Sequence, residues 1–215
     1  MTITTQSPGA SGCLFVIAAP SGGGKTSVVN ALLEREPRIR LSVSYTTRPP
    51  RPGERDGEHY HFVDVSRFME LKDAGTFLEH AHVHGNWYAT SAPWLADQVR
   101  QGNDVLLEID WQGAAQVREL VPGSVLVFLL PPSIESLRER LQKRGQDSAA
   151  VIEQRLAAAR EEVRHAADFD YVIMNQDFAR AVDDLSVIVR AARLAASRQL
   201  VRHARTLSEL TDTTR

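Results

Sequence analysis

The chain has 215 residues, of which 43% are hydrophobic and 24% are charged. These proportions are typical of a folded globular protein and exclude a collagen-like, coiled-coil or disordered chain as the main architecture. The 25 Lys and Arg residues nearly balance the 27 Asp and Glu residues, which disfavours general binding to nucleic acid or to a membrane surface. The single cysteine, Cys13, excludes an internal disulfide framework and a zinc site built only from cysteines.

The first residues, MTITTQSPGASG, have neither the basic nor the apolar region of a secretory signal. The apolar runs further along are far shorter than the roughly 20 residues that a helix needs to cross a bilayer. We therefore expect a cytoplasmic protein with a flexible tail over residues 1–11.

Four short apolar runs predict buried strands of a parallel sheet. They lie at residues 13–18, 105–109, 125–130 and 171–174. Helical patterns follow them at residues 26–35, 114–120, 133–143 and 177–201. This alternation predicts an α/β fold, with a parallel sheet core and helices on both faces.

Residues 44–90 break the alternation. Three prolines between positions 49 and 52 exclude a helix there, and short alternating pieces at 59–63 and 76–83 predict a small mixed or antiparallel insertion. Residues 134–164 are helical, rich in arginine and interrupted at 145–148, which predicts a mobile lid. The core then comprises residues 12–43, 91–133 and 165–195, and residues 196–215 form a helix end and a polar C-terminal tail.

The segment APSGGGKT follows the first predicted strand and precedes the first predicted helix, as a P-loop must. Glycine backbone N–H groups at a helix N-terminus can cradle phosphate oxygens, Lys25 adds positive charge, and the Thr26 hydroxyl is suited to Mg²⁺. Ala19 stands where the usual motif has glycine. The predicted nucleotide-binding residues are Ala19, Pro20, Ser21, Gly22, Gly23, Gly24, Lys25 and Thr26. A P-loop alone does not define the acceptor, but the Asn-Lys-x-Asp segment that reads guanine in GTPases is absent.

The segment SYTTRPPRPGE carries Arg48 and Arg51 in a turn stiffened by proline. Arginine presents a planar fork suited to phosphate, and a rigid turn loses little entropy when it binds an anion. A solvated loop is the alternative interpretation. Tyr60 and Tyr88 are candidate hydroxyl donors to the same phosphate, or ordinary half-buried tyrosines.

Strand alternation over residues 76–84 places Glu79 on one apolar face with Phe77. A carboxylate on such a face needs a partner. Guanine offers two adjacent donors, N1–H and N2–H₂, whereas N1 of adenine is an acceptor. Glu79 is therefore predicted to select guanine, with Ser44 and Thr90 donating to O6, unless it is a surface residue or part of a structural ion pair. His80, His82 and His84 fall on the opposite face, which we interpret as a solvated face rather than a metal site.

Together these segments resemble the guanylate kinase family, nucleoside-monophosphate kinases that phosphorylate GMP. The resemblance covers about residues 12–195 and rests on APSGGGKT, SVSYTTRPPRPGE, FLEHAHVHGNWYAT, LLEIDWQGA, and LLPPSIESLRERLQKRG followed by EQRLAAAREE. It implies a parallel core, a GMP-binding insertion and a lid, and transfer of the γ-phosphoryl group of ATP to GMP and dGMP in purine nucleotide metabolism.

The resemblance also implies roles for single residues. The catalytic residues are Lys25, Arg140, Arg144 and Arg155. The GMP-binding residues are Ser44, Arg48, Arg51, Tyr60, Glu79, Tyr88, Thr90 and Glu108. Asn175 joins the P-loop in binding ATP, near the adenine. Mg²⁺ is the implied cofactor, held by Thr26 and, through water, by Asp110.

Two alternatives remain at this point: a non-catalytic guanylate-kinase-like module that binds a protein, and a kinase for another nucleoside monophosphate. The intact P-loop disfavours the first, and Glu79 disfavours the second. ATP and GMP are the expected partners, with no nucleic acid and no membrane. The sequence leaves open whether the chain is a monomer or a homo-oligomer, because the apolar positions of the last predicted helix suit a core or a dimer contact equally well.

Overall fold

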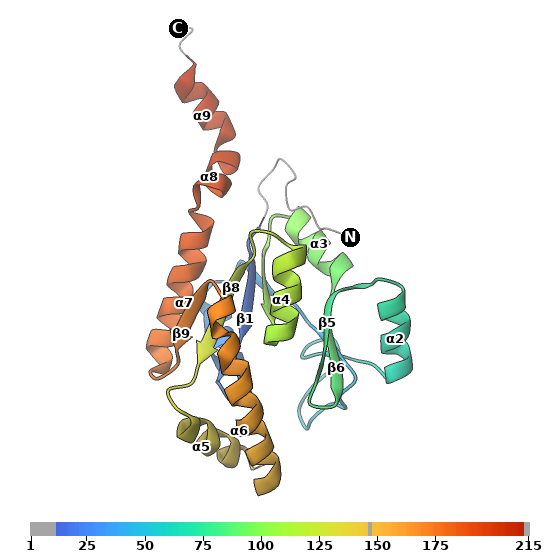
Figure 1. Ribbon diagram of the computed structural model, residues 1–215. Helices are drawn as coiled ribbons and strands as arrows, with labels where there is room; N and C mark the ends of the chain where they lie inside the picture. Colours follow the sequence, from blue (N-terminus) through green and yellow to red (C-terminus); the bar gives the residue numbers. More distant parts are fainter. Residues whose placement is uncertain (1–11, 146–147, 213–215) are drawn as a thin grey trace.

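A computed structural model describes residues 12–145 and 148–212 (Figure 1). Its central sheet has five parallel strands in the order β2-β7-β1-β8-β9. These are β1 (Leu14–Ala18), β2 (Ile39–Leu41), β7 (Asp104–Glu108), β8 (Val125–Leu130) and β9 (Tyr171–Met174). The four strands expected from apolar runs are all present. The edge strand β2 was not expected, because it has three residues and only Ile39 is buried.

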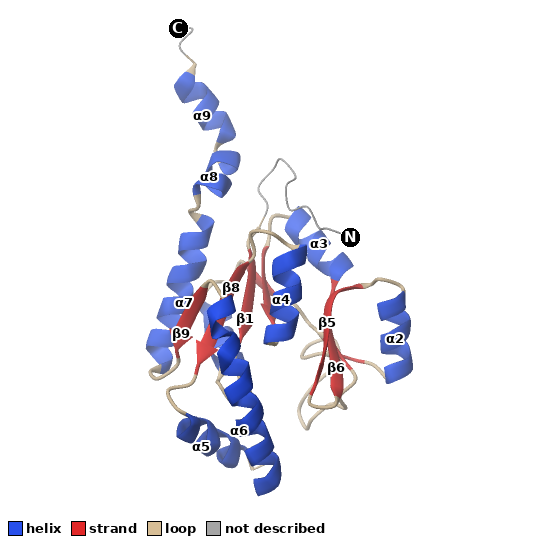
Figure 2. Cartoon of the chain, in the orientation of Figure 1, coloured by secondary structure: helices blue, strands red, loops and turns tan. Residues whose placement is uncertain are grey.

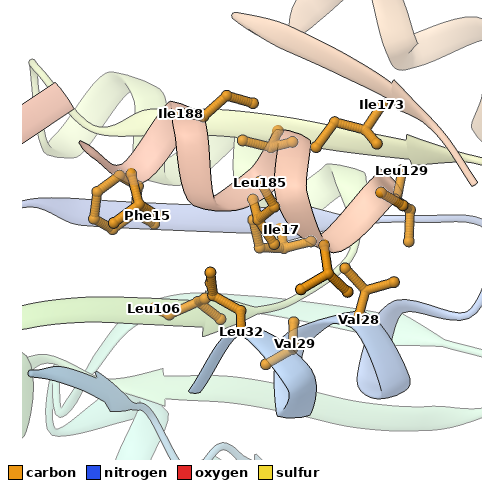
Figure 3. Packing of buried hydrophobic residues seen from close by; sticks show 14 of the residues in the cluster. Phe15, Ile17, Val28, Val29, Leu32, Leu106, Leu129, Ile173, Leu185 and Ile188 are labelled. Carbon is orange, nitrogen blue, oxygen red and sulfur yellow. The ribbon is translucent and has the colours of Figure 1, made fainter. Parts of the chain in front are cut away.

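Helices cover both faces of this sheet, as the alternation predicted (Figure 2). Side chains of β1 alternate between two cores, because successive residues of a strand point to opposite faces. Phe15 and Ile17 pack with α1 (Lys25–Arg35) and α7 (Phe178–Arg193), as Figure 3 shows. Leu14 and Val16 pack on the other face, with α3 (Ala92–Arg100) and α4 (Trp111–Leu120).

The insertion at residues 44–90 forms a second, mixed sheet of four strands in the order β4-β3-β6-β5. They are β3 (Tyr45–Thr46), β4 (His61–Phe62), β5 (Phe77–Val83) and β6 (Asn86–Ser91), and α2 (Val65–Asp73) lies between β4 and β5.

One expectation about β5 is wrong. The register against β6 shifts between Phe77 and Glu79, so these two residues do not share a face. The ring of Phe77 instead packs against Phe68 of α2, with ring centroids 4.9 Å apart. An irregularity of this kind reverses the alternation of a strand, and the residue pattern alone does not reveal it.

The segment predicted to be a lid consists of α5 (Ile134–Arg144) and α6 (Ala149–Arg164), which pack on each other through Leu137, Leu141, Ile152 and Leu156. Ser133 caps α5 by accepting a hydrogen bond from the N–H of Ser136 at 3.1 Å. A short 3₁₀ helix, η1 (His165–Asp168), then leads into β9. Part of the predicted interruption at 145–148 lies outside the described residues.

The C-terminal end differs from the expectation of one helix over 177–201 followed by a polar tail. Helix α7 ends at Arg193, and Ala195 leaves the helical conformation. Two further helices, α8 (Ala196–Arg202) and α9 (Ala204–Thr211), then point away from the body (Figure 1). Of the apolar positions that the sequence left open, Leu185 and Ile188 are core residues, whereas Leu194 and Leu200 are exposed.

The predicted N-terminal tail at residues 1–11 lies outside the described residues. In the part of the chain that the structure describes, none of the helices combines the length and the apolar character needed to cross a bilayer.

Candidate active site

The candidate site lies at the carboxyl edge of the parallel sheet, where ligands usually bind in open α/β folds. The phosphate loop follows β1, Asp110 follows β7, the lid follows β8, and Asn175 follows β9. Four strands that are far apart in sequence therefore bring their end residues to one place. A parallel arrangement requires this, because every carboxyl end meets the same edge.

The phosphate loop has the conformation that its glycines predict. Gly22 and Gly24 have φ angles of 85° and 90°, a region that favours glycine. Gly24 directly precedes α1, so the first backbone N–H groups of that helix lack a side-chain cap and face the loop. Ala19 does not adopt a left-handed φ, which explains why alanine is tolerated where the usual motif has glycine.

Arg140 of α5 and Asn175, which directly follows β9, hydrogen-bond to this loop and support it. The carbonyl oxygen of Gly23 accepts hydrogen bonds from Asn175 Nδ2 at 2.8 Å and from the Arg140 guanidinium at 3.2 Å. Arg140 also donates to the carbonyl oxygen of Asn175 at 3.2 Å. Asn175 is buried, so this contact is a fixed part of the loop's support. Its expected contact with adenine stays a prediction.

Lysine, threonine and carboxylate side chains meet next to the loop. Lys25 Nζ donates to the carbonyl oxygen of Ile109 at 2.8 Å, and Thr26 Oγ1 donates to Glu108 Oε1 at 2.5 Å. Asp110 caps α4 by accepting a hydrogen bond from the N–H of Gly113 at 2.9 Å. Burial raises the pKa of Asp110, although that N–H and the charge of Lys25 act in the opposite direction. In this structure Glu108 therefore lies beside the predicted Mg²⁺ residues.

A buried carboxylate lies across the same cavity. Glu79 is 3% exposed, and Thr90 Oγ1 donates to its Oε1 at 2.7 Å. Burial raises the pKa of Glu79 to about 7, although the Thr90 hydroxyl lowers it in part. The other oxygen, Oε2, faces α4, where a Cβ on Gly113 would come within 2.6 Å of it. Ser44 is also buried in this region.

The proline-stiffened turn is held by an internal ion pair. Arg48 binds Glu54 at 2.8 Å, and Glu54 also accepts a hydrogen bond from the N–H of Arg51 at 2.7 Å. The Arg48 guanidinium lies 5.4 Å from the centre of the Tyr60 ring. Burial, and next the nearby Glu108, raise the pKa of Tyr60 to about 12, so its hydroxyl stays a donor.

A cavity of about 260 Å³ joins the phosphate loop to the insertion. Its lining includes the whole loop and these predicted site residues: Ser44, Arg51, Tyr60, Glu79, Tyr88, Glu108, Asp110 and Arg155. Four others are not in the lining: Arg48 is held in its turn, Thr90 bonds to Glu79, and Arg140 and Asn175 support the loop. Arg144 ends α5, and its side chain lies outside what the structure describes.

Glu162, which the sequence did not single out, also lines this cavity, and so does His84, which was expected on the strand face opposite Glu79. His84 lies in the turn after β5 with a φ of 50°, apart from His80 and His82, whose rings lie near Trp87. Among the described residues there is no group of three His, Cys, Asp or Glu side chains that could hold a metal ion. A larger open cavity, about 1100 Å³, lies at the amino ends of the strands and contains none of the predicted site residues.

A glycine loop lies between a strand and a helix, with a lysine and a threonine at the helix start, and a buried carboxylate and an arginine from α6 line the same cavity. These features define a P-loop nucleotide kinase. Comparison with known proteins identifies the family of this chain. A family model described as guanylate kinase matches residues 11–192. The chain therefore belongs to the guanylate kinase family.

Individual relatives agree with this assignment. The guanylate kinase of Aromatoleum aromaticum is 61% identical over 183 residues, which are 85% of this chain and 90% of the relative. That of Paraburkholderia xenovorans is 55% identical over 93% of this chain and 88% of its own. A crystal structure of guanylate kinase from Anaplasma phagocytophilum superposes with a TM-score of 0.76 at 36% identity, over 92% of this chain and 96% of that one.

Proposed function

We propose that this chain transfers the γ-phosphoryl group of ATP to GMP, and also to dGMP, with ADP and GDP or dGDP as products. The observation that carries the proposal is the position of Glu79. This buried carboxylate faces the same cavity as the phosphate loop, so a purine bound to it would direct its own phosphate toward a nucleotide held by the loop. Two adjacent N–H donors of guanine match a carboxylate, and adenine has no such pair.

The chain's own residues supply what this reaction needs. The acceptor phosphate is already anionic at neutral pH, so no protein base is needed to generate a nucleophile. The main obstacle is repulsion between two polyanions. Arg51, Tyr60 and Tyr88 would bind the GMP phosphate, and Lys25 and Arg155 would neutralise charge on the transferred group. The hydrogen bonds of Glu54 to this turn would keep Arg48 and Arg51 in place.

The residues beside the loop fit Mg²⁺, which prefers oxygen ligands and keeps several of its waters. A hydroxyl and two carboxylates meet there: Thr26 lies against Glu108, and Asp110 follows two residues later. Thr26 would bind the ion directly, and Asp110 would bind it through water. When bound, the ion neutralises charge on the β- and γ-phosphates. The catalytic roles of Arg140 and Arg144 and a location in the cytoplasm stay predictions.

An assay of ADP release with GMP, dGMP, AMP, UMP and dTMP as acceptors tests the proposal. Only the two guanine nucleotides should support turnover above the rate of ATP hydrolysis. Turnover with AMP or dTMP would contradict the role of Glu79, and binding without turnover would indicate a non-catalytic module.

Glu79→Gln tests the base contact directly. One acceptor becomes a donor that faces a donor of guanine, so the KM for GMP should rise roughly 10- to 100-fold, while the KM for ATP changes little. Glu70→Gln, an exposed change on α2 of the same insertion, is the matched control and should alter neither value. Equal rises in both KM values for Glu79→Gln would contradict the assignment.

A further inference from the structure

Glu162 is a partly buried acid of the cavity that the mechanism above does not use. It lies on α6 of the lid and lines the cavity next to the phosphate loop. Its neighbour Glu161 behaves differently: it is exposed and pairs with Arg164 at 2.7 Å. Two adjacent glutamates on one helix therefore differ in exposure, and only Glu162 lines the cavity.

The carboxylate of Glu162 lies beside the phosphate loop, because Glu162 and Ser21 line the same cavity and the backbone N–H of Ser21 is near enough to lower the pKa of that carboxylate. Burial raises the pKa of Glu162, whereas the Ser21 N–H and the charge of Lys25 favour the ionised form. This interaction joins a helix of the lid to the segment that is predicted to hold the triphosphate.

The interaction lies close to the fixed end of α6. The ring of His165, directly after the helix, stacks on Trp111 with centroids 3.5 Å apart and planes 6° apart. Arg118 of α4 then donates to the carbonyl oxygen of Asp168 at 3.0 Å. These contacts tie the end of α6 to α4, and Figure 1 shows that the other end of α6 lies away from the sheet, beside α5.

Arg155 lies seven residues before Glu162, and thus on the same face of α6 because seven residues make nearly two turns. Both residues line the cavity. Arg155 is also near enough to His84 of the insertion to lower the pKa of that imidazole, although burial is the larger cause. One face of α6 therefore crosses the cavity, from the phosphate loop at Glu162 to the insertion at Arg155.

We propose that Glu162 is a positioning residue, which fastens the base of the lid to Ser21 of the phosphate loop and so fixes where Arg155 meets the phosphates. The proposal rests on the proposed kinase function. Seven residues span about 10 Å of helix, so a rotation of α6 by ~6° about the Glu162 contact would move Arg155 by about 1 Å. A misplacement of about 1 Å can cost ~100-fold in rate.

The experiment compares kcat, the KM for GMP and the KM for ATP in the full chain with Glu162→Ala, Glu162→Gln and the control Glu161→Gln. Glu162→Ala should lower kcat roughly 10- to 100-fold, with both KM values changed less than about threefold. Glu162→Gln keeps one acceptor for the Ser21 N–H and should lose less. Glu161→Gln should match the wild type. Thermal unfolding of each variant separates these effects from misfolding, and Glu162→Gln keeps the test valid if Glu162→Ala does not fold.

A double-mutant cycle with Arg155→Ala tests whether Glu162 acts on the reaction through Arg155. If Glu162 acts through Arg155, the variant with both changes should be no slower than Arg155→Ala alone. Three results would each overturn the inference. They are a kcat of the double variant reduced by the product of the two single effects, an unchanged kcat in Glu162→Ala, and an effect of Glu162→Ala confined to the KM for GMP. A wild-type chain without GMP kinase activity would instead refute the proposed function, so the two failures are distinguishable.

Discussion

The buried carboxylate of Glu79 should lower the stability of the unliganded protein at high pH. Its pKa is about 7 in the folded chain against an ordinary value of 4.5, and burial is the main cause. Below about pH 4.5 both states carry the proton. Between pH 4.5 and 7 the unfolded chain loses the proton while the folded chain retains it, so stability falls as pH rises. Above pH 7 the loss is complete, and it amounts to about 3 kcal/mol at ~1.4 kcal/mol per pH unit.

Glu79→Gln removes this titration, because the amide stays neutral. We expect Glu79→Gln to gain stability relative to the wild type as pH rises, so that its free energy of unfolding minus that of the wild type increases by about 3 kcal/mol between pH 4.5 and pH 8. Urea unfolding without nucleotide measures both proteins across this range. Contributions of other groups cancel in the difference, and Glu70→Gln on the exposed face of α2 should show no such growth.

Saturating GMP should reduce this difference at pH 8 by about 1.4 to 2.7 kcal/mol, the equivalent of a 10- to 100-fold difference in affinity, because the guanine donors pair with the carboxylate and stabilise only the wild type fully. A difference between the two proteins that stays constant from pH 4.5 to pH 8 would refute the reasoning. It would mean that the surroundings of Glu79 compensate the charge without a ligand.

Two further substitutions test the surroundings of the site and the fold. Gly113→Ala should raise the KM for GMP about tenfold and leave the KM for ATP unchanged in initial-rate measurements, because the new Cβ would lie 2.6 Å from Glu79 Oε2. An unchanged KM for GMP would show that the carboxylate can move freely. Arg193→Met should lower the free energy of unfolding by about 2 kcal/mol, because it leaves two largely buried carboxylates, each 2.6 Å from the guanidinium, without their partner. A melting temperature equal to that of the wild type would argue against this pairing.

The sequence predicts the parallel core well because its signal is local and strong. Strands β1, β7 and β8 are apolar runs that are largely buried on both faces, whereas β9 is an apolar edge strand in which only Ile173 is buried; each of the four is followed by a helical pattern. Strand β2 has the sequence IRL and gains its structure from pairing with β7, a neighbour more than 60 residues away. A short edge strand of this kind depends on long-range pairing, which residue patterns do not report.

The residues of the candidate site likewise fall into those that local sequence predicts and those that depend on long-range contacts. The phosphate loop is one continuous segment, so its glycines, Lys25 and Thr26 could be predicted together with their roles. The support of that loop could not, because Gly23 and Asn175 are 152 residues apart. Glu54 is an intermediate case: its distance of six residues from Arg48, within one rigid turn, is a signal that could have been used.

Glu162 shows why an acid in a phosphate-binding cavity escapes sequence analysis. In the segment AREEV both glutamates resemble solvated helix residues, and only the packing of α6 against the loop separates them. An acid with restricted access to solvent near bound polyanions is costly, so it should persist only where its contact contributes something that a neutral residue does not. For Glu79 that contribution would be recognition of the base. For Glu162 it would be the connection between the occupied loop and the lid, since the Ser21 N–H and Lys25 both favour its charged form. The two acids would then serve opposite ends of one reaction: Glu79 would select the acceptor, and Glu162 would align the cation that meets the transferred group.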